Sequence, residues 1–361
     1  MVIELNMVNR GEKMKYNKIV YLFSSSYRER YRQDNINVLA YPSGFIMHFR
    51  YDRKGVDDKL LNDIDSLKGK EAIIVIVDSE KGNKGVFPKF YPVRKAKIIK
   101  AELSGSVLHL YFELLPDWID HTEIDYDSLI KSLKERPKEG KEYLSGKFIV
   151  MDQLVQPIEF SPRTEAWESI IKKISVLESY KRTLFFKLDA VREVSQDKEL
   201  KIGNIDKHVE ILRGYVIRSG GKYVLEISLY LGNDLSVVGK DKIVIRTDEK
   251  IFYPVIPKEI SINFRVDKQI IYIPTKQVFF DNLTYLIIEL EKKYLSGPKI
   301  IIPLKVKYNR IKFGLSFLIF FAGLIFTGGV IPLSGTTSII IKVIGSFMST
   351  ATIAWLYRKI G

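Results

Sequence analysis

The stretch KYVLEISLYL, residues 222–231, places an apolar side chain at every second position. Successive side chains of a β-strand point to opposite sides, so this alternation predicts a strand with one buried face. That face holds Tyr223, Leu225, Ile227, Leu229 and Leu231. Gly220 and Gly221, which precede the stretch, favour a tight hairpin from the run VEILRGYVIR at residues 209–218.

Short apolar runs of the same kind continue along the chain as far as residue 309. They are KIVIRT at 242–247, EISINFRV at 259–266, QIIYIPT at 269–275, YLIIELE at 285–291 and KIIIPLKVK at 299–307. Residues of the kind that form turns bound each run, and no helix-length segment separates them. Residues 183–309 are therefore predicted to form a β-sandwich rather than a parallel sheet.

Residues 1–125 are predicted to form a small β-barrel or sandwich domain with one capping helix. The strand-like runs lie at residues 17–23, 36–42, 44–51, 71–78, 92–103 and 107–115. The capping helix, VDDKLLNDIDSL at residues 56–67, has apolar residues at helical spacing on one face.

Residues 126–182 are predicted to be a helical connector between the two β-rich parts. Its helix lies within SPRTEAWESIIKKISVLESYKR at residues 161–182, with Pro162 suited to the first turn. An apolar stripe follows at Trp167, Ile170, Ile171, Ile174 and Leu177. The stripe has two interpretations, as core that docks the two β-rich parts together or as a contact between copies of the chain.

The C-terminal part, residues 310–361, has no charged residue between Lys312 and Lys342. A membrane-spanning helix needs roughly 20 apolar residues. Residues 313–331 and 338–357 meet that length and are separated by a turn rich in glycine and proline. The fold class is accordingly predicted as a mainly β, α+β cytoplasmic head followed by a two-helix transmembrane hairpin. A buried helical pair, or a single span followed by an interfacial helix, is the alternative.

The positions of cations set the expected orientation of this hairpin. Lys and Arg residues flank both outer ends of the spans, and none lies in the connecting turn, so the positive-inside rule places both termini in the cytoplasm. The formal net charge is +14, and much of the excess lies in and just before the apolar tail. The expected partner of that charge is the lipid bilayer, through anionic lipid, rather than a polynucleotide.

One face of the second expected span is small and polar. It consists of Lys342, Gly345, Ser346, Ser349 and Thr352. Such a stripe either packs on the first span or lines a pore in a homo-oligomer, and the Lys342 ammonium can reach the headgroups along its aliphatic stem.

The sequence lacks the common catalytic motifs. It has no cysteine, no phosphate-binding loop and no GxSxG or HExxH motif, so we predict neither an enzyme nor a cofactor. Four histidines, His48, His109, His121 and His208, are scattered, and no two have helical ligand spacing.

An acidic segment, ELLPDWIDHTEIDYD at residues 113–127, is the candidate metal site. Asp117, Asp120, His121 and Glu123 could supply ligands to a hard cation, although the spacing matches no calcium loop. The competing interpretation is a solvated acidic rim.

Two basic segments are candidates for ligand binding. SSSYRERYRQDN, residues 24–35, interleaves aromatic rings with guanidinium groups, the chemistry that stacks bases and pairs phosphates. YPVRKAKIIK, residues 91–100, adds a second group of cations. The candidate residues are Tyr27, Arg28, Arg30, Tyr31, Arg32, Arg94, Lys95 and Lys97. Binding of a nucleotide or nucleic acid competes here with a structural salt-bridge network and with a protein-partner surface.

Three functions are consistent with these patterns. In the first, a membrane-anchored cytoplasmic sensor or effector couples ligand or partner binding by the head to the hairpin, with or without oligomerisation. In the second, the hairpin holds a static binding scaffold at the membrane. In the third, the chain is a membrane-bound enzyme without a recognised motif.

Overall fold

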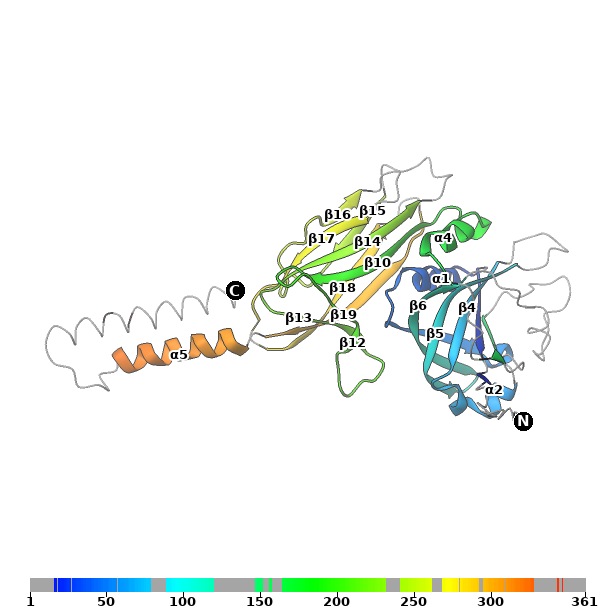
Figure 1. The fold of residues 1–361 in the computed structure, drawn as a ribbon, viewed down its shortest axis with the longest axis horizontal. Helices are drawn as coiled ribbons and strands as arrows, with labels where there is room; N and C mark the ends of the chain where they lie inside the picture. The colour runs from blue at the N-terminus through cyan, green and yellow to red at the C-terminus, as the bar shows by residue number, and fades with distance from the viewer. Residues whose placement is uncertain are drawn as a thin grey trace, which may run out of the picture. The chain divides into compact units, whose positions relative to one another are not determined.

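The computed structural model describes residues 16–17, 19–26, 28–56, 58–78, 89–119, 147–151, 156–157, 164–231, 241–261, 268–278, 280–291, 295–308 and 310–327, with Val343 and Ser346. Strands arranged in several sheets make up most of this structure, as the sequence predicts (Figure 1). The chain divides into two compact units. Unit 1 comprises Met1–Phe185 and Gly232–Leu235, and unit 2 comprises Phe186–Leu231 and Ser236–Gly361.

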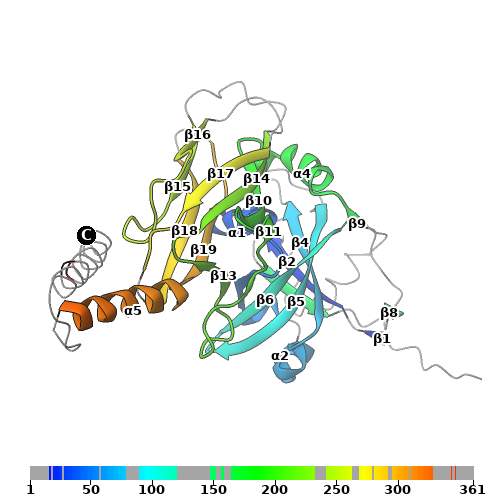
Figure 2. The same cartoon turned by 60° about the vertical axis from the view of Figure 1, so that its left-hand side comes forward.

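Unit 1 is built on a curved seven-stranded sheet in the order β3-β6-β5-β4-β2-β7, with β9 paired to β6 (Figure 2). Its strands are β2 (Val20–Ser25), β3 (Ile46–Asp52), β4 (Glu71–Asp78), β5 (Lys89–Ser104), β6 (Val107–Ile119), β7 (Lys147–Met151) and β9 (Thr164–Glu165). A parallel bridge between Val56, just after β3, and Ile149 of β7 joins the two ends of the sheet. The sheet thereby closes into a barrel. A separate pair is formed by β1 (Tyr16–Asn17) and β8 (Gln156–Pro157).

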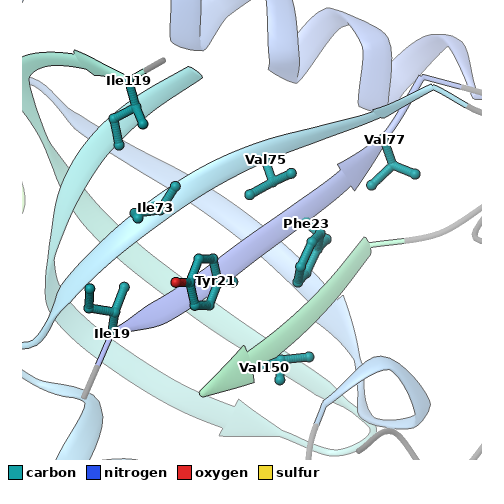
Figure 3. Close-up of a cluster of buried hydrophobic side chains, with 8 residues drawn as sticks. All are labelled: Ile19, Tyr21, Phe23, Ile73, Val75, Val77, Ile119 and Val150. Carbon is teal, nitrogen blue, oxygen red and sulfur yellow. The ribbon is translucent and has the colours of Figure 1, made fainter. Parts of the chain in front are cut away.

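Strand β2 lies between β4 and β7 and is buried along its whole length. It pairs in parallel with β4, and parallel strands buried on both faces read as continuous apolar runs. One face contributes Tyr21 and Phe23 to an apolar cluster that includes Ile73 and Val75 of β4 (Figure 3). This cluster accounts for the near-continuous hydrophobicity of the two strands.

The helices of unit 1 cover the barrel. They are α1 (Glu29–Ala40), α2 (Asp58–Asn62) and α4 (Trp167–Ser175), with short 3-10 turns η1 (Arg53–Gly55), η2 (Ile64–Leu67) and η3 (Glu178–Tyr180). The predicted strand at residues 36–42 is wrong, because most of this run forms the end of α1. Ile36, Leu39 and Ala40 are buried at helical spacing, which a short apolar run does not distinguish from a strand.

The apolar stripe predicted in the connector is confirmed. Its members Trp167, Ile170, Ile171, Ile174 and Leu177 are all buried. The Trp167 indole Nε1 donates a hydrogen bond to the Leu39 carbonyl at 2.9 Å, so α4 is fixed to the end of α1. The helix begins at Trp167, later than the predicted start at Pro162.

Unit 2 is a sandwich-like pair of sheets. One sheet has the order β11-β10-β14-β17 and the other β12-β13-β19-β18-β15-β16. The strands are β10 (Leu184–Glu193), β11 (Lys198–Glu199), β12 (Gly203–Asn204), β13 (Arg213–Arg218), β14 (Lys222–Leu231), β15 (Lys242–Arg246), β16 (Glu259–Ser261), β17 (Lys268–Pro274), β18 (Asn282–Glu291) and β19 (Lys299–Lys307). Tyr223, Leu225, Ile227 and Leu229 of the opening stretch are buried, as their alternation predicts.

The hairpin predicted at Gly220 and Gly221 is wrong. Strand β13 pairs with β12 and β19, whereas β14 pairs in the other sheet, so the turn carries the chain from one sheet to the other. Gly220 has a φ of +70°, and Gly221 donates through its N–H to the Thr275 hydroxyl at 2.8 Å. This hydrogen bond to the residue that follows β17 stabilises the crossing.

The predicted transmembrane hairpin, and with it the predicted integral-membrane location, is also wrong. No helix among the described residues has both the length and the apolar character that crossing a membrane requires. Helix α5 (Arg310–Thr327) carries two cations, Arg310 and Lys312, at its start.

The second expected span, residues 338–357, lies outside the described residues except for Val343 and Ser346. Of its predicted polar face, Ser346 is described and is exposed. Lys342, Gly345, Ser349 and Thr352 lie outside the described residues.

The apolar cluster of unit 1 predicts that a valine-to-alanine substitution lowers the free energy of unfolding more at a buried position than at an exposed one. Val75→Ala removes two buried methyl groups, and we expect it to lower the free energy of unfolding by about 2 kcal/mol. Val176→Ala, at a side chain that is 67% exposed, should change it by no more than about 0.5 kcal/mol. Urea unfolding of the whole chain measures both values, and equal effects would contradict the buried cluster.

Candidate ligand-binding site

The candidate site begins where β2 gives way to α1. Strands β2 and β4 run parallel, so their carboxyl ends lie at the same edge of the sheet. The chain leaves β2 at Ser25 and enters α1 at Glu29. Arg28, Arg30 and Tyr31 therefore lie at the start of a helix, where the helix dipole favours anions.

Three cations surround the Tyr31 ring. The guanidinium carbons of Arg30 and Arg28 lie 4.7 and 5.8 Å from the ring centroid, and the Lys147 ammonium lies 5.4 Å from it. Arg30 also donates a hydrogen bond to the Tyr31 hydroxyl at 2.8 Å. We call these four residues the Tyr31 cluster, and its charge attracts an anion while its ring offers a stacking face.

Lys147 is the buried member of this cluster. Its side chain is 3% exposed, and its ammonium lies 2.5 Å from an Asp34 carboxylate oxygen and 3.5 Å from the centroid of the Phe49 ring. Burial lowers the pKa of the Lys147 ammonium to about 8, although Asp34 favours the charged form. Arg30 and Arg50 lower this pKa further. One carboxylate thus faces several cations.

The outer face of β3 and β6 carries a second group of rings. His48 Nε2 and His109 Nδ1 are 3.0 Å apart, so that one imidazole donates a hydrogen bond to the other. The His48 ring stacks on Tyr111, with centroids 4.4 Å apart and planes 10° from parallel. Burial and the neighbouring His109 lower the pKa of His48. We call these three residues the histidine–tyrosine platform.

A buried polar network lies on the other side of α1. The Ser26 and Ser179 hydroxyls donate to one carboxylate oxygen of Asp78 at 3.1 and 3.2 Å. Asn35 of α1 donates to the Tyr180 hydroxyl at 3.0 Å, and burial raises the pKa of Tyr180. The Oδ1 atom of Asn35 is buried and has no hydrogen-bond partner in the part of the chain that the structure describes. The network fixes η3 to the start of α1.

The structure brings together only part of the predicted ligand site. Arg28, Arg30 and Tyr31 converge, while Tyr27 lies outside the described residues. Arg32 lies on α1, and its charge acts on Tyr180. Lys95 and Lys97 lie on β5, where Lys97 is paired in register with Glu71 and Glu113. These two lysines therefore do not belong to the Tyr31 cluster.

Arg94, another predicted ligand residue, is structural. Its side chain is buried, and its guanidinium donates to the carbonyl oxygens of Val38, Tyr41 and Leu115 at 2.7–2.9 Å. It also lies 4.3 Å from the Trp118 ring centroid. Burial lowers the pKa of Arg94 to about 9, which leaves it charged at neutral pH. Arg94 therefore ties the end of α1 to β6.

The predicted metal site is only partly described. Asp117 lies on β6, and Asp120, His121 and Glu123 lie outside the described residues. Among the residues that the structure does describe, no three His, Asp or Glu side chains are placed to hold a metal ion.

Sequence reasoning missed Lys147, Asp34, Phe49 and the histidine–tyrosine platform. Alternation in β3 and β6 does place His48, His109 and Tyr111 on outward positions. The search for helical ligand spacing could not find them, because strand pairing brings His48 opposite Tyr111 and Arg50 opposite His109.

Comparison with known proteins adds no functional assignment. No protein family matches the sequence, and no similar protein was found among the curated ones. Among solved structures, domains 4 and 5 of the S-layer protein SbsC match at 12% identity with a TM-score of 0.19. The match covers 30% of this chain and 51% of that one. A likeness this low carries no argument about fold or function.

The buried Lys147 predicts a specific pH dependence of stability. The folded chain releases the Lys147 proton near pH 8 and the unfolded chain near pH 10.5, so the unfolded state binds more protons between them. Stability should therefore rise with pH across this window, by about 3 kcal/mol from this residue. Urea unfolding at pH 7.5–10 should show the rise in the wild type and in Lys97→Met but not in Lys147→Met. Parallel profiles for all three proteins would contradict a buried Lys147.

Arg94 predicts a large cost for a substitution that keeps the charge. Arg94→Lys cannot reach the separated carbonyl oxygens with one ammonium, and each buried carbonyl left unpaired costs about 1–3 kcal/mol. We expect a loss of about 3 kcal/mol in the free energy of unfolding. The matched control Arg53→Lys, at an exposed arginine of unit 1, should stay within about 0.5 kcal/mol of the wild type. An equally stable Arg94→Lys protein would overturn the structural role.

Proposed function

We propose that unit 1 is a binding module for a phosphorylated ligand that carries a planar ring, a ligand of the nucleotide class. The single observation that carries the proposal is the placement of three cations around the Tyr31 ring, with Asp34 as the facing carboxylate. A ring stacks on Tyr31 in this arrangement, and its phosphate pairs with the exposed Arg28 and Arg30.

The start of α1 supports the same ligand. Among the described residues, no side chain makes a capping hydrogen bond at Arg28, the N-cap position, and the helix dipole favours an anion there, while Glu29 places one carboxylate in the same turn. Arg30 already holds the Tyr31 hydroxyl in place, which reduces the entropy that a ligand must remove on binding. The side chains of the site are thus partly preorganised to bind a ring and an anion.

This proposal keeps the ligand-binding part of the sensor hypothesis and omits the membrane hairpin. It differs from the main competing interpretation, in which these arginines form a structural salt-bridge network. A network would pair each cation with a carboxylate, whereas Arg28 and Arg30 are placed over a ring.

Three small probes test the proposal by isothermal titration calorimetry on the full chain. Adenosine monophosphate offers ring and phosphate, ribose 5-phosphate only the phosphate, and adenosine only the ring. We expect the monophosphate to bind tightest, with an affinity that falls as salt rises. Tyr31→Leu should weaken it about tenfold, the value of one stacked base, and Arg30→Gln should do the same through the phosphate.

The controls lie outside the cluster. Tyr285→Leu, at an exposed tyrosine of unit 2, and Lys97→Gln should bind like the wild type. Binding of the monophosphate no tighter than adenosine, or unchanged in Tyr31→Leu and Arg30→Gln, would sink the proposal.

A further inference from the structure

The Asp34 carboxylate lies beside the Tyr31 ring. Asp34 follows Tyr31 by three positions and Arg30 by four on α1, and side chains at these spacings share one face of a helix. The Lys147 ammonium contacts both, since it is 2.5 Å from Asp34 Oδ2 and 5.4 Å from the centroid of the Tyr31 ring. Glu29, the acid of the first turn, is two positions from Tyr31 and does not share this face.

Asp34 is the outer member of its ion pair with Lys147. The Asp34 side chain is 37% exposed, whereas the Lys147 side chain is 3% exposed. The ammonium bonds one carboxylate oxygen, Oδ2. Because an ionised carboxylate has about four lone-pair sites, Asp34 keeps acceptor sites on its solvent side after it has paired with Lys147.

The charge of this pair sets what the edge of a bound ring must carry. Lys147 has a pKa of about 8 and is therefore mostly charged at neutral pH. The carboxylate that pairs with it is ionised, so it accepts hydrogen bonds and donates none. A ring that stacks on Tyr31 has an edge near this carboxylate, and that edge must present donors rather than acceptors.

The donor pattern of the ring edge distinguishes the nucleobases. Guanine presents N1–H beside its N2 amino group, two neighbouring donors that match the two oxygens of a carboxylate. Adenine and cytosine present one amino group beside an acceptor nitrogen. Uracil presents one N–H between two carbonyl oxygens, which a carboxylate repels. Only the guanine edge can therefore form a bidentate pair with Asp34.

We propose that Asp34 selects a guanine-type ring, so that the ligand of unit 1 is a guanine nucleotide. The ring stacks on Tyr31, the phosphate pairs with Arg28 and Arg30, and the N1–H and N2–H groups donate to Asp34. Lys147 holds the carboxylate from its inner side and does not contact the ligand. This inference rests on the proposed function, because the Tyr31 cluster supplies the stacking face and the cations for the phosphate.

Changes made to the ligand test the inference without altering the protein. The full chain is titrated by calorimetry with the monophosphates of guanosine, inosine, 1-methylguanosine and adenosine. Inosine lacks the N2 amino group, and 1-methylguanosine lacks the N1 hydrogen. We expect guanosine monophosphate to bind about tenfold more tightly than adenosine monophosphate, the discrimination of one bidentate pair. Removal of either donor should lose most of that advantage.

A variant of the carboxylate tests the same contact from the protein side. Asp34→Asn keeps the shape of the side chain but replaces one acceptor oxygen with a donor, so the ratio of guanosine to adenosine monophosphate affinity should fall to about one. Asp63→Asn, at an exposed aspartate of unit 1 outside the Tyr31 cluster, is the matched control and should keep the wild-type ratio. Circular dichroism checks that both variants fold, and if Asp34→Asn does not, the ligand series on the wild type decides the outcome.

The results separate the two proposals. Equal affinity for guanosine and adenosine monophosphates overturns the role of Asp34 and leaves the nucleotide-binding function in place. The same holds if 1-methylguanosine monophosphate binds as tightly as guanosine monophosphate, or if the guanine preference persists in a folded Asp34→Asn protein. Failure of every monophosphate to bind overturns the proposed function itself.

Discussion

The burial of the Lys147 ammonium is the constraint on which the site depends. An ammonium removed from water needs a partner charge, and Asp34 of α1 supplies it at 2.5 Å. The same ammonium lies on the Phe49 ring of β3, so a single group ties α1, β3 and β7 at the place where the barrel closes. Because the first turn of α1 carries Arg28, Arg30 and Tyr31, the position of the binding residues follows from this pair.

Neighbouring residues on α1 hold the helix in different ways. Asp34 meets a cation at the partly exposed edge, whereas Asn35 is fully buried and donates both to the Ser24 carbonyl and to the Tyr180 hydroxyl. At the far end of the helix, Arg94 binds the Val38 and Tyr41 carbonyls. A helix fixed at several points along its length loses little entropy when its first turn meets a ligand.

The sequence predicts what is local in this molecule and misses what depends on pairing. The alternation of β14 and the apolar stripe of α4 identify buried faces correctly, because each pattern lies within one element. The strand predicted at residues 36–42 is wrong, since the spacing of Ile36, Leu39 and Ala40 fits a helix as well as a strand. The expectation of two spans rests on the whole uncharged stretch after Lys312, whereas the structure describes a helix only as far as Thr327.

The site shows the same division between local pattern and tertiary pairing. Arg28, Arg30 and Tyr31 could be found because they are neighbours in the chain. Lys147, by contrast, lies in the region interpreted as a helical connector, and its partner Asp34 is more than a hundred residues away. The His48–His109 contact requires the register of β3 on β6, two strands that are not consecutive in the chain, and no local pattern contains that register.

Hydrogen bonds in unit 1 join the start of α1 to the segment that leads into β10. Ser26 lies two residues before Arg28, and its hydroxyl meets Ser179 at 3.1 Å and Asp78 at 3.1 Å. Ser179 and Tyr180 form η3, and the chain enters β10 four residues later, at Leu184. A ligand that moves the first turn of α1 therefore pulls on hydrogen bonds that hold the segment leading out of unit 1.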